Sequence, residues 1–180
     1  MYALTLSGGD QLIGAVLCSK KDDVLLATKE GRSIRFPVSD IRPTGRQSQG
    51  VKGIRLSKKD EVIGMVLFQK GVNSSDYFIL TATENGFAKR TEIDAYRIQS
   101  RGGKGITNIK ISSRIGVAKN ICSVAEDDEI MCITQKGILI RVRVKDIRKT
   151  GRSTQGVKII SLGKADKLSS VARIIPDINH

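Results

Sequence analysis

A short polar loop that ends in glycine occurs three times in the chain, and this repetition constrains the fold more than any other feature of the sequence. The loops end at Gly50, Gly105 and Gly156, which are 55 and 51 residues apart. A repeat of this length is typical of architectures in which each copy forms one supersecondary unit. We therefore expect three copies of one unit, here called repeats one, two and three.

Each repeat contains four short apolar or alternating segments separated by turn residues. In repeat one these segments are residues 12–18, 24–28, 33–36 and 51–56. Their equivalents are residues 62–68, 77–83, 87–91 and 106–111 in repeat two and 117–124, 129–134, 138–144 and 157–162 in repeat three. Segments of this length bounded by turns predict β-strands, and no stretch has the period of an amphipathic helix.

Four short strands in every repeat predict an all-β, β-propeller-like fold of four-stranded blades. We expect one domain over residues 1–180, with about three blades plus partial ends. Residues 1–9 would end a preceding blade, 10–59, 60–114 and 115–165 would be blade repeats, and 166–180 would be a closing or partial strand. The alternative, two small barrels, fits the regular spacing less well.

The charge of the chain favours a polyanionic partner. The sequence has 31 Lys and Arg against 18 Asp and Glu, which gives a net charge of +13 and a pI near 9.9. This exceeds what solubility requires of a small domain, so we expect an anion-binding surface. Aromatic residues make up 4% of the chain and Trp is absent, which argues against base stacking as the main contact.

Other residue types exclude several kinds of site. The three cysteines, Cys18, Cys122 and Cys132, lie in apolar runs without CxxC spacing, so we expect buried, reduced thiols. The single histidine, His180, is the last residue and a poor catalytic candidate. We expect no metal, no cofactor and no membrane segment, and a cytoplasmic location.

Arginines fall into three columns when the repeats are aligned on the closing glycine. The first column, fifteen residues before that glycine, holds Arg35, Arg90 and Arg141. The middle column, eight residues before it, holds Arg42, Arg97 and Arg148. The loop column, four residues before it, holds Arg46, Arg101 and Arg152. Repetition places the same cations on each blade, so that they form a basic belt along successive blades. Such a belt would contact DNA phosphates, which gives affinity without much sequence preference.

A structural role is the alternative for some of these arginines. Those of the middle column follow Asp40, Asp94 and Asp146 by two or three residues and could pair with them, although exposed pairs contribute little. The loop column of Arg46, Arg101 and Arg152 has no repeated acid nearby. We therefore expect the loop column to be the more reliable ligand surface.

The loop of repeat two carries the most specific motif, Gln99-Ser100-Arg101-Gly102-Gly103-Lys104-Gly105. It matches the gyrase A box, Q-R-R-G-G-K-G, at six of seven positions and departs at Ser100. With the T-G-R-x-[ST]-Q-G-V-K loops of the other repeats, the chain resembles the C-terminal domain of the DNA gyrase A subunit over essentially its whole length. In the family the box belongs to the first blade. A full repeat precedes it here, so the resemblance implies the later blades of the domain.

The resemblance implies a β-pinwheel whose basic rim binds and wraps duplex DNA and so supports negative supercoiling by DNA gyrase. The other partners it implies are the gyrase B subunit together with the remainder of the gyrase A subunit. It implies DNA contacts from Arg101 and Lys104 and from the three arginine columns. Catalysis is expected outside this chain, because the catalytic tyrosine and the ATP site of the family lie elsewhere.

Two other functions remain open at this stage. One is the C-terminal DNA-binding domain of the topoisomerase IV A subunit, which shares the blades. The other, of a different class, is a propeller that serves as a protein-interaction scaffold. The scaffold predicts no salt-sensitive binding of DNA.

Overall fold

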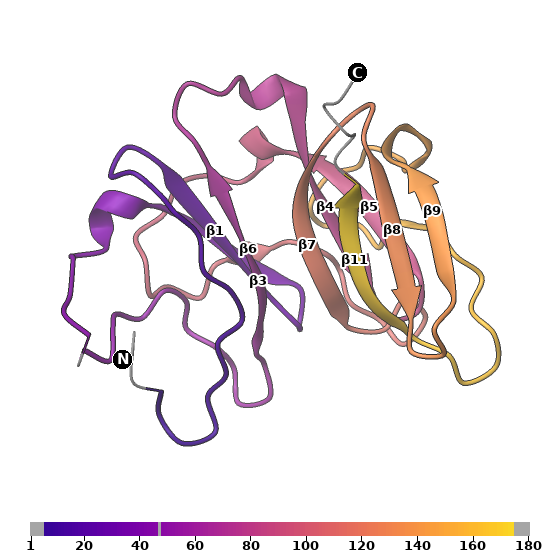
Figure 1. The fold of residues 1–180 in the computed structure, drawn as a ribbon, viewed down its shortest axis with the longest axis horizontal. Coiled ribbons are helices and arrows are strands. Elements are labelled where there is room, and N and C mark those ends of the chain that lie inside the picture. Colours follow the sequence, from indigo (N-terminus) through magenta and orange to yellow (C-terminus); the bar gives the residue numbers. More distant parts are fainter. Residues whose placement is uncertain (1–5, 47, 175–180) are drawn as a thin grey trace.

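The expected all-β fold is confirmed. The computed structural model describes residues 6–46 and 48–174, and the regular elements in them are β-strands and single turns of 3-10 helix (Figure 1). The strands are β1 Asp23–Thr28, β2 Arg32–Pro37, β3 Val62–Phe68, β4 Tyr77–Thr83, β5 Phe87–Glu92, β6 Ile106–Thr107, β7 Ala118–Ala125, β8 Glu129–Thr134, β9 Leu139–Arg143, β10 Val157–Lys158 and β11 Leu168–Ile174. The 3-10 turns are η1 Val38–Asp40, η2 Ser74–Asp76, η3 Ile93–Ala95 and η4 Val144–Asp146.

The strands form three antiparallel sheets, of which the first two are each built from two consecutive repeats and the third from repeat three and the closing strand β11. Their strand orders are β3-β1-β2-β6, β10-β5-β4-β7 and β11-β8-β9. The second and third strands of a repeat form a hairpin at the centre of a sheet, and the first strand of the next repeat flanks it. In the first two sheets, the fourth strand of the next repeat closes the other edge. Successive sheets are thus joined by exchanged strands.

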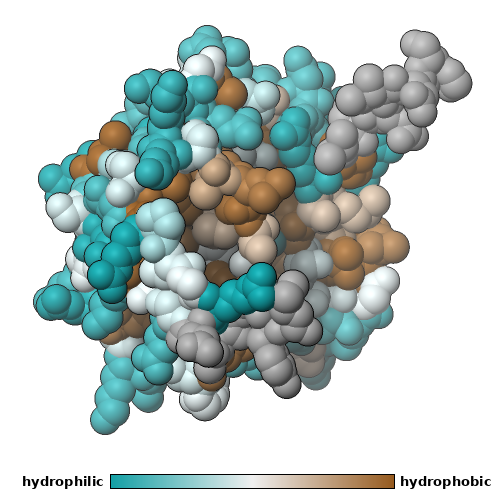
Figure 2. Space-filling model, turned by 60° about the vertical axis from the view of Figure 1, so that its left-hand side comes forward, coloured by the Kyte–Doolittle hydropathy of each residue, from teal (hydrophilic) through white to brown (hydrophobic). Residues whose placement is uncertain are grey.

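Two strands expected in repeat one are absent, and this exchange explains why. Residues 11–19 and 51–56 have no regular structure, so the strand predictions for 12–18 and 51–56 were wrong. Their equivalents in later repeats pair with the hairpin of the preceding repeat, and no such hairpin precedes repeat one among the described residues. Apolar side chains of this region are exposed, and Figure 2 shows hydrophobic surface in a hollow on this side.

The same cause leaves Cys18 exposed, contrary to the expectation of a buried thiol. Cys132 is buried and Cys122 half-buried, and burial raises the pKa of Cys122 to about 12 and that of Cys132 to about 11. Both thiols are therefore protonated and unreactive at neutral pH. Residues 1–5 of the segment expected to end a preceding blade, and the end of the chain with His180, lie outside the described residues.

The hydrophobic core lies between neighbouring sheets. Leu25 and Val66 of the first sheet pack in one cluster with Ile79 and Ile121 of the second. A second cluster joins the second and third sheets through Leu80, Val124, Ile130, Cys132 and Val171. Burying a Leu, Ile or Val side chain contributes about 1.5–3 kcal/mol, so these clusters hold the sheets firmly against each other. In Figure 1 the sheets follow one another from β1 on the left to β9 on the right.

This packing decides where the basic loops lie. The inner-edge strand β3 packs against β7, and β7 against β11, so that β6 and β10 form the outer edges of their sheets. The loops that carry the arginines lead from the third strand of each repeat toward these outer edges. We call residues 41–50, 96–105 and 147–156 the rim loops.

Candidate nucleic-acid interface

Each rim loop of repeats two and three is fixed by backbone hydrogen bonds to the segment that follows the rim loop of the preceding repeat. The Gly102 amide donates to the Gly53 carbonyl oxygen at 2.6 Å, and the Arg55 amide donates to the Gly103 carbonyl oxygen at 2.8 Å. One repeat later, the Lys110 amide donates to the Thr154 carbonyl oxygen at 2.9 Å. Consecutive rim loops are therefore connected through these segments, and we call the three loops together the row of rim loops. The rim loop of repeat one has no preceding partner among the described residues.

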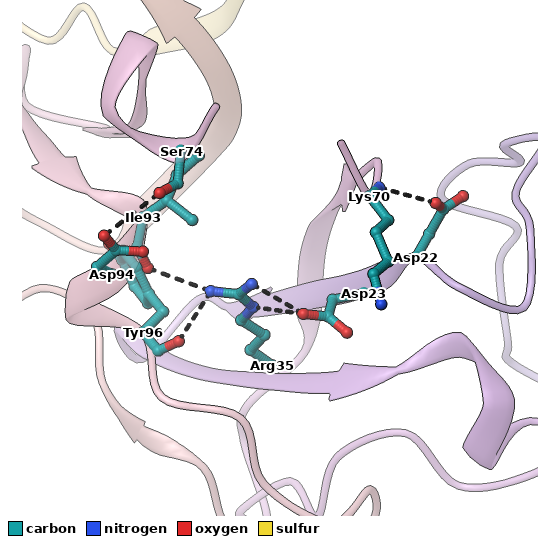
Figure 3. Close-up of polar contacts among 8 residues, drawn as sticks. All are labelled: Asp22, Asp23, Arg35, Lys70, Ser74, Ile93, Asp94 and Tyr96. Carbon is teal, nitrogen blue, oxygen red and sulfur yellow. Dashed lines mark hydrogen bonds and ion pairs between the residues drawn. The ribbon is translucent and has the colours of Figure 1, made fainter. Parts of the chain in front are cut away.

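In the first column of arginines, the side chains of repeats one and two are largely buried. Arg35 donates through Nε and Nη2 to Oδ2 of Asp23 at 3.0 and 2.8 Å, and its side chain is 16% exposed. Its Nη1 reaches the carbonyl oxygens of Ile93 and Tyr96 at 3.5 and 3.3 Å, so the guanidinium bridges two consecutive blades (Figure 3). The guanidinium also lies over the Phe68 ring. Nearby, backbone amides of Ser19 and Lys70 lower the pKa of Asp22.

Arg90 occupies the equivalent bridge one blade further along. It donates through Nε to the Ile147 carbonyl oxygen at 2.7 Å, pairs with Glu126 and is 9% exposed. The hydrogen bond from Arg90 lowers the pKa of Glu126. Arg141, the third member, pairs with Glu129 but is 62% exposed, because no later rim loop covers it among the described residues. The DNA-binding role of this column stays a prediction, and its first two members clearly stabilise the fold.

The middle column is the most accessible of the three. Arg42, Arg97 and Arg148 are all exposed, and within the described part of the chain none of these side chains forms a hydrogen bond or ion pair. The suggested partners are engaged elsewhere in two repeats: Asp94 accepts from Ser74, and Asp146 pairs with Arg143. Three unpaired cations therefore stand at equivalent points of the row of rim loops.

The loop column is partly committed to the protein. Arg101 donates to the carbonyl oxygens of Asp40 and Lys52 at 3.0 and 3.2 Å, and Arg152 donates to that of Thr107 at 2.8 Å. Lys52 and Thr107 are equivalent positions in successive repeats, so this is a repeated contact between blades. Both guanidinium groups keep further N–H groups for a ligand. Arg46 is exposed, and so is the Lys104 side chain, whose amine has no partner among the described residues.

The heptad of residues 99–105 is thus a supported loop rather than a free one. Gln99 and Ser100 are its first two residues, and the Gln99 amide donates to the Arg35 carbonyl oxygen at 2.8 Å. Gly102 has a φ of +77°, a conformation that suits glycine. Arg32 donates to the carbonyl oxygens of Lys104 and Gly105 at 3.3 and 2.7 Å. Lys104 is therefore presented outward from a backbone held on both sides.

Sequence reasoning missed two cations that support the row. Arg32 holds the heptad, and the fully buried Lys89 lies beneath the rim loop of repeat three. The signal for Lys89 was available, because the equivalent positions in the other repeats are Ile34 and Ile140. The same signal was available for Arg32, whose equivalents in the other repeats are Phe87 and Ile138.

The described residues offer little for catalysis. Tyr96 is buried and donates to Oδ1 of Asn108 at 2.7 Å, and burial raises its pKa, so it serves as a core residue. In residues 6–46 and 48–174, no group of three His, Cys, Asp or Glu side chains is placed to hold a metal ion. No helix in this part of the chain is long and apolar enough to cross a membrane. The surface that remains is a row of cations suited to phosphate oxygens.

Comparison with known proteins identifies the family. A family profile described as DNA gyrase C-terminal domain, beta-propeller, matches residues 22–69, 77–116 and 128–175. The chain belongs to the family of DNA gyrase A C-terminal domains. The DNA gyrase A subunit of Streptomyces coelicolor is 46% identical over 91% of this chain and 19% of its own length. That of Mycolicibacterium smegmatis is 42% identical over 96% of the chain and 20% of its own length.

The chain thus spans about a fifth of the length of these gyrase A relatives. A solved DNA gyrase A C-terminal domain superposes with a TM-score of 0.86 at 26% identity, covering 96% of this chain and 57% of that one. A topoisomerase IV C-terminal domain superposes with a TM-score of 0.87 at 22% identity, covering 96% and 52%. At that identity, the second likeness shows a shared fold alone.

Proposed function

We propose that this chain binds duplex DNA without sequence preference by placing the phosphate backbone along its row of rim loops. The observation that carries the proposal is the middle column: Arg42, Arg97 and Arg148 are exposed, unpaired within the described residues and equivalent in three consecutive repeats. Arg101, Arg152 and Lys104 add cations to the same loops. The net charge of +13 gives the long-range attraction that a polyanion requires.

The spacing of these cations also supports wrapping. Because the sheets follow one another and each contributes one rim loop, a duplex that contacts all three loops would meet the same cations at successive points. A path that turns with the sheets bends the duplex, and the energetic cost of bending is spread over the contacts. The described residues of the rim loops contain no recognition helix or aromatic platform, so the contacts would be to the DNA backbone rather than to base edges.

Within its family, the chain would act as part of the gyrase A subunit. Binding and wrapping of DNA here would support negative supercoiling by the ATP-dependent topoisomerase, together with the gyrase B subunit plus the rest of the A subunit, in the bacterial cytoplasm. Strand cleavage and ATP hydrolysis would take place outside this chain. The box-like heptad and the gyrase A relatives favour gyrase over topoisomerase IV.

A salt titration tests the proposal. Six phosphate contacts should make log K fall with log salt concentration with a slope of about −5. Duplexes of unrelated sequence should bind with the same affinity and slope, which fluorescence anisotropy of a labelled duplex would measure. A slope near zero, or binding that depends strongly on sequence, would refute backbone binding. A slope near zero is also the result that the interaction-scaffold alternative predicts.

A further inference from the structure

Lys89 breaks the pattern of the repeats. It stands sixteen residues before the closing glycine of repeat two, where repeats one and three have Ile34 and Ile140. Its side chain is fully buried, with 0% of its surface exposed. Lysine is almost never fully buried without a partner of opposite charge, because removing an ammonium group from water is costly. Something about this position must therefore favour an amine over the isoleucine of the other repeats.

The hydrogen bonds of Lys89 show what it holds. Its Nζ donates to Oγ1 of Thr91 at 2.8 Å and to the Gly151 carbonyl oxygen at 3.1 Å. Thr91 Oγ1 donates in turn to the Thr150 carbonyl oxygen at 2.9 Å. The amine thus fixes two successive carbonyl groups in the middle of the rim loop of repeat three, that of Gly151 directly and that of Thr150 through Thr91. The next residue of that loop is Arg152.

The surroundings of Lys89 supply no counter-charge. Within the described chain no carboxylate pairs with it, and the charged group that acts on it is Arg152, which has the same sign. Thr81 lies opposite Lys89 on β4, and Tyr96, which lies beside Thr91, stays neutral because burial raises its pKa. Burial and then Arg152 lower the pKa of Lys89 to about 7. Two cations therefore lie at one site, Lys89 on β5 and Arg152 on the rim loop above it, and Lys89 can lose its charge near neutral pH.

An anion at this loop would complete the arrangement. Arg152 uses Nη1 for the Thr107 carbonyl oxygen, and its Nε and Nη2 have no partner among the described residues. A phosphate oxygen bound there would favour the charged form of Lys89, as a nearby opposite charge does. By linkage, a ligand that favours the protonated amine binds more tightly when the amine is already protonated.

We propose that Lys89 is a positioning residue for the rim loop of repeat three and that, together with Arg152, it forms a proton-linked site for a DNA phosphate. This inference rests on the proposed function and deepens it, because it assigns one contact of the row and makes that contact pH-dependent. Lys89 need not touch the phosphate. It holds the loop that presents Arg152 and takes up a proton when the duplex binds.

The first test is the pH dependence of DNA binding in the chain and in Lys89→Ile, which introduces the residue of the other repeats. Both proteins carry His180→Gln, so that the single histidine does not contribute. At constant ionic strength, the chain should bind a short labelled duplex about fivefold more tightly at about pH 6 than at about pH 8.5. Lys89→Ile should change less than about twofold. Parallel pH profiles would overturn the proposal.

A second measurement needs no substitution at Lys89 and applies even if Lys89→Ile fails to fold. The enthalpy of DNA binding is measured in two buffers of different ionisation enthalpy. Both are held at about pH 7.5, a pH at which the Lys89 amine is mostly neutral. The enthalpies should differ, which shows uptake of a substantial fraction of a proton. Equal enthalpies would overturn the proposal and leave DNA binding intact. Absence of salt-dependent binding at every pH would instead refute the proposed function, and with it this site.

Discussion

The closing glycine of repeat two provides a sharp test of the strand exchange between repeats. Gly105 has a φ of +65° and lies against β2 of the preceding repeat, where a Cβ atom would be 2.2 Å from the Ser33 carbonyl oxygen. A left-handed backbone costs a non-glycine residue about 1–2 kcal/mol. Forcing a methyl group against fixed backbone adds about 1–3 kcal/mol. Gly105→Ala should therefore lower the free energy of unfolding by about 2–5 kcal/mol.

Gly50 is the matched control, because it closes the rim loop of repeat one with a φ of +75° but has nothing within 4 Å of an added Cβ. Gly50→Ala should cost about 1–2 kcal/mol, the backbone contribution alone. Urea unfolding followed by circular dichroism would compare the two variants, with an unchanged m-value as the sign that unfolding is still two-state. Equal losses for Gly50→Ala and Gly105→Ala would refute the docking of repeat two on β2.

Three other predictions concern residues within and beneath the rim loops and at the bridges between blades. Relative to Lys89→Ile, the chain should gain about 2–3 kcal/mol of stability from about pH 6 to pH 9. The unfolded state holds the proton of this amine up to about pH 10.4, while folding lowers its pKa to about 7, so a denaturation series without this gain would contradict the burial of Lys89. Arg35→Ala should cost about 2–4 kcal/mol and Arg141→Ala less than about 1, as judged by urea unfolding, because Arg35 bridges two blades and Arg141 forms an exposed pair. Gly102→Val should reduce DNA bending, measured by fluorescence transfer between duplex ends, more than it reduces affinity.

The sequence predicted much of the fold because strand-length runs and turn glycines are local signals. It did not predict which repeat each strand joins. Residues 12–18 and 51–56 have the composition of strands, but a strand also needs a neighbour for its backbone groups. Their neighbours would belong to a preceding hairpin, which the described residues do not contain. Equal spacing of like segments cannot show this exchange between repeats.

The sequence predicted where the cations of the candidate site lie in each repeat, but not which groups they bind within the protein. Alignment on the closing glycine found every arginine column and the heptad with Lys104. It could not show that Arg35, Arg90 and Arg152 donate to backbone carbonyls of neighbouring repeats, because a carbonyl acceptor leaves no trace in the side-chain sequence. It ranked the loop column above the middle column, whereas the structure leaves the middle column more accessible.

The central claim is that the row of rim loops binds DNA phosphates, and the most direct test is a pair of triple variants with equal charge loss. One replaces Arg42, Arg97 and Arg148 by Ala, and the other replaces three exposed lysines in turns between repeats, Lys58, Lys59 and Lys164. Salt titrations of duplex binding would be compared. For the variant without Arg42, Arg97 and Arg148, the magnitude of the slope of log K against log salt concentration should decrease by about three. The variant without the three turn lysines should keep the original slope. Equal slopes for the two variants would contradict the claim.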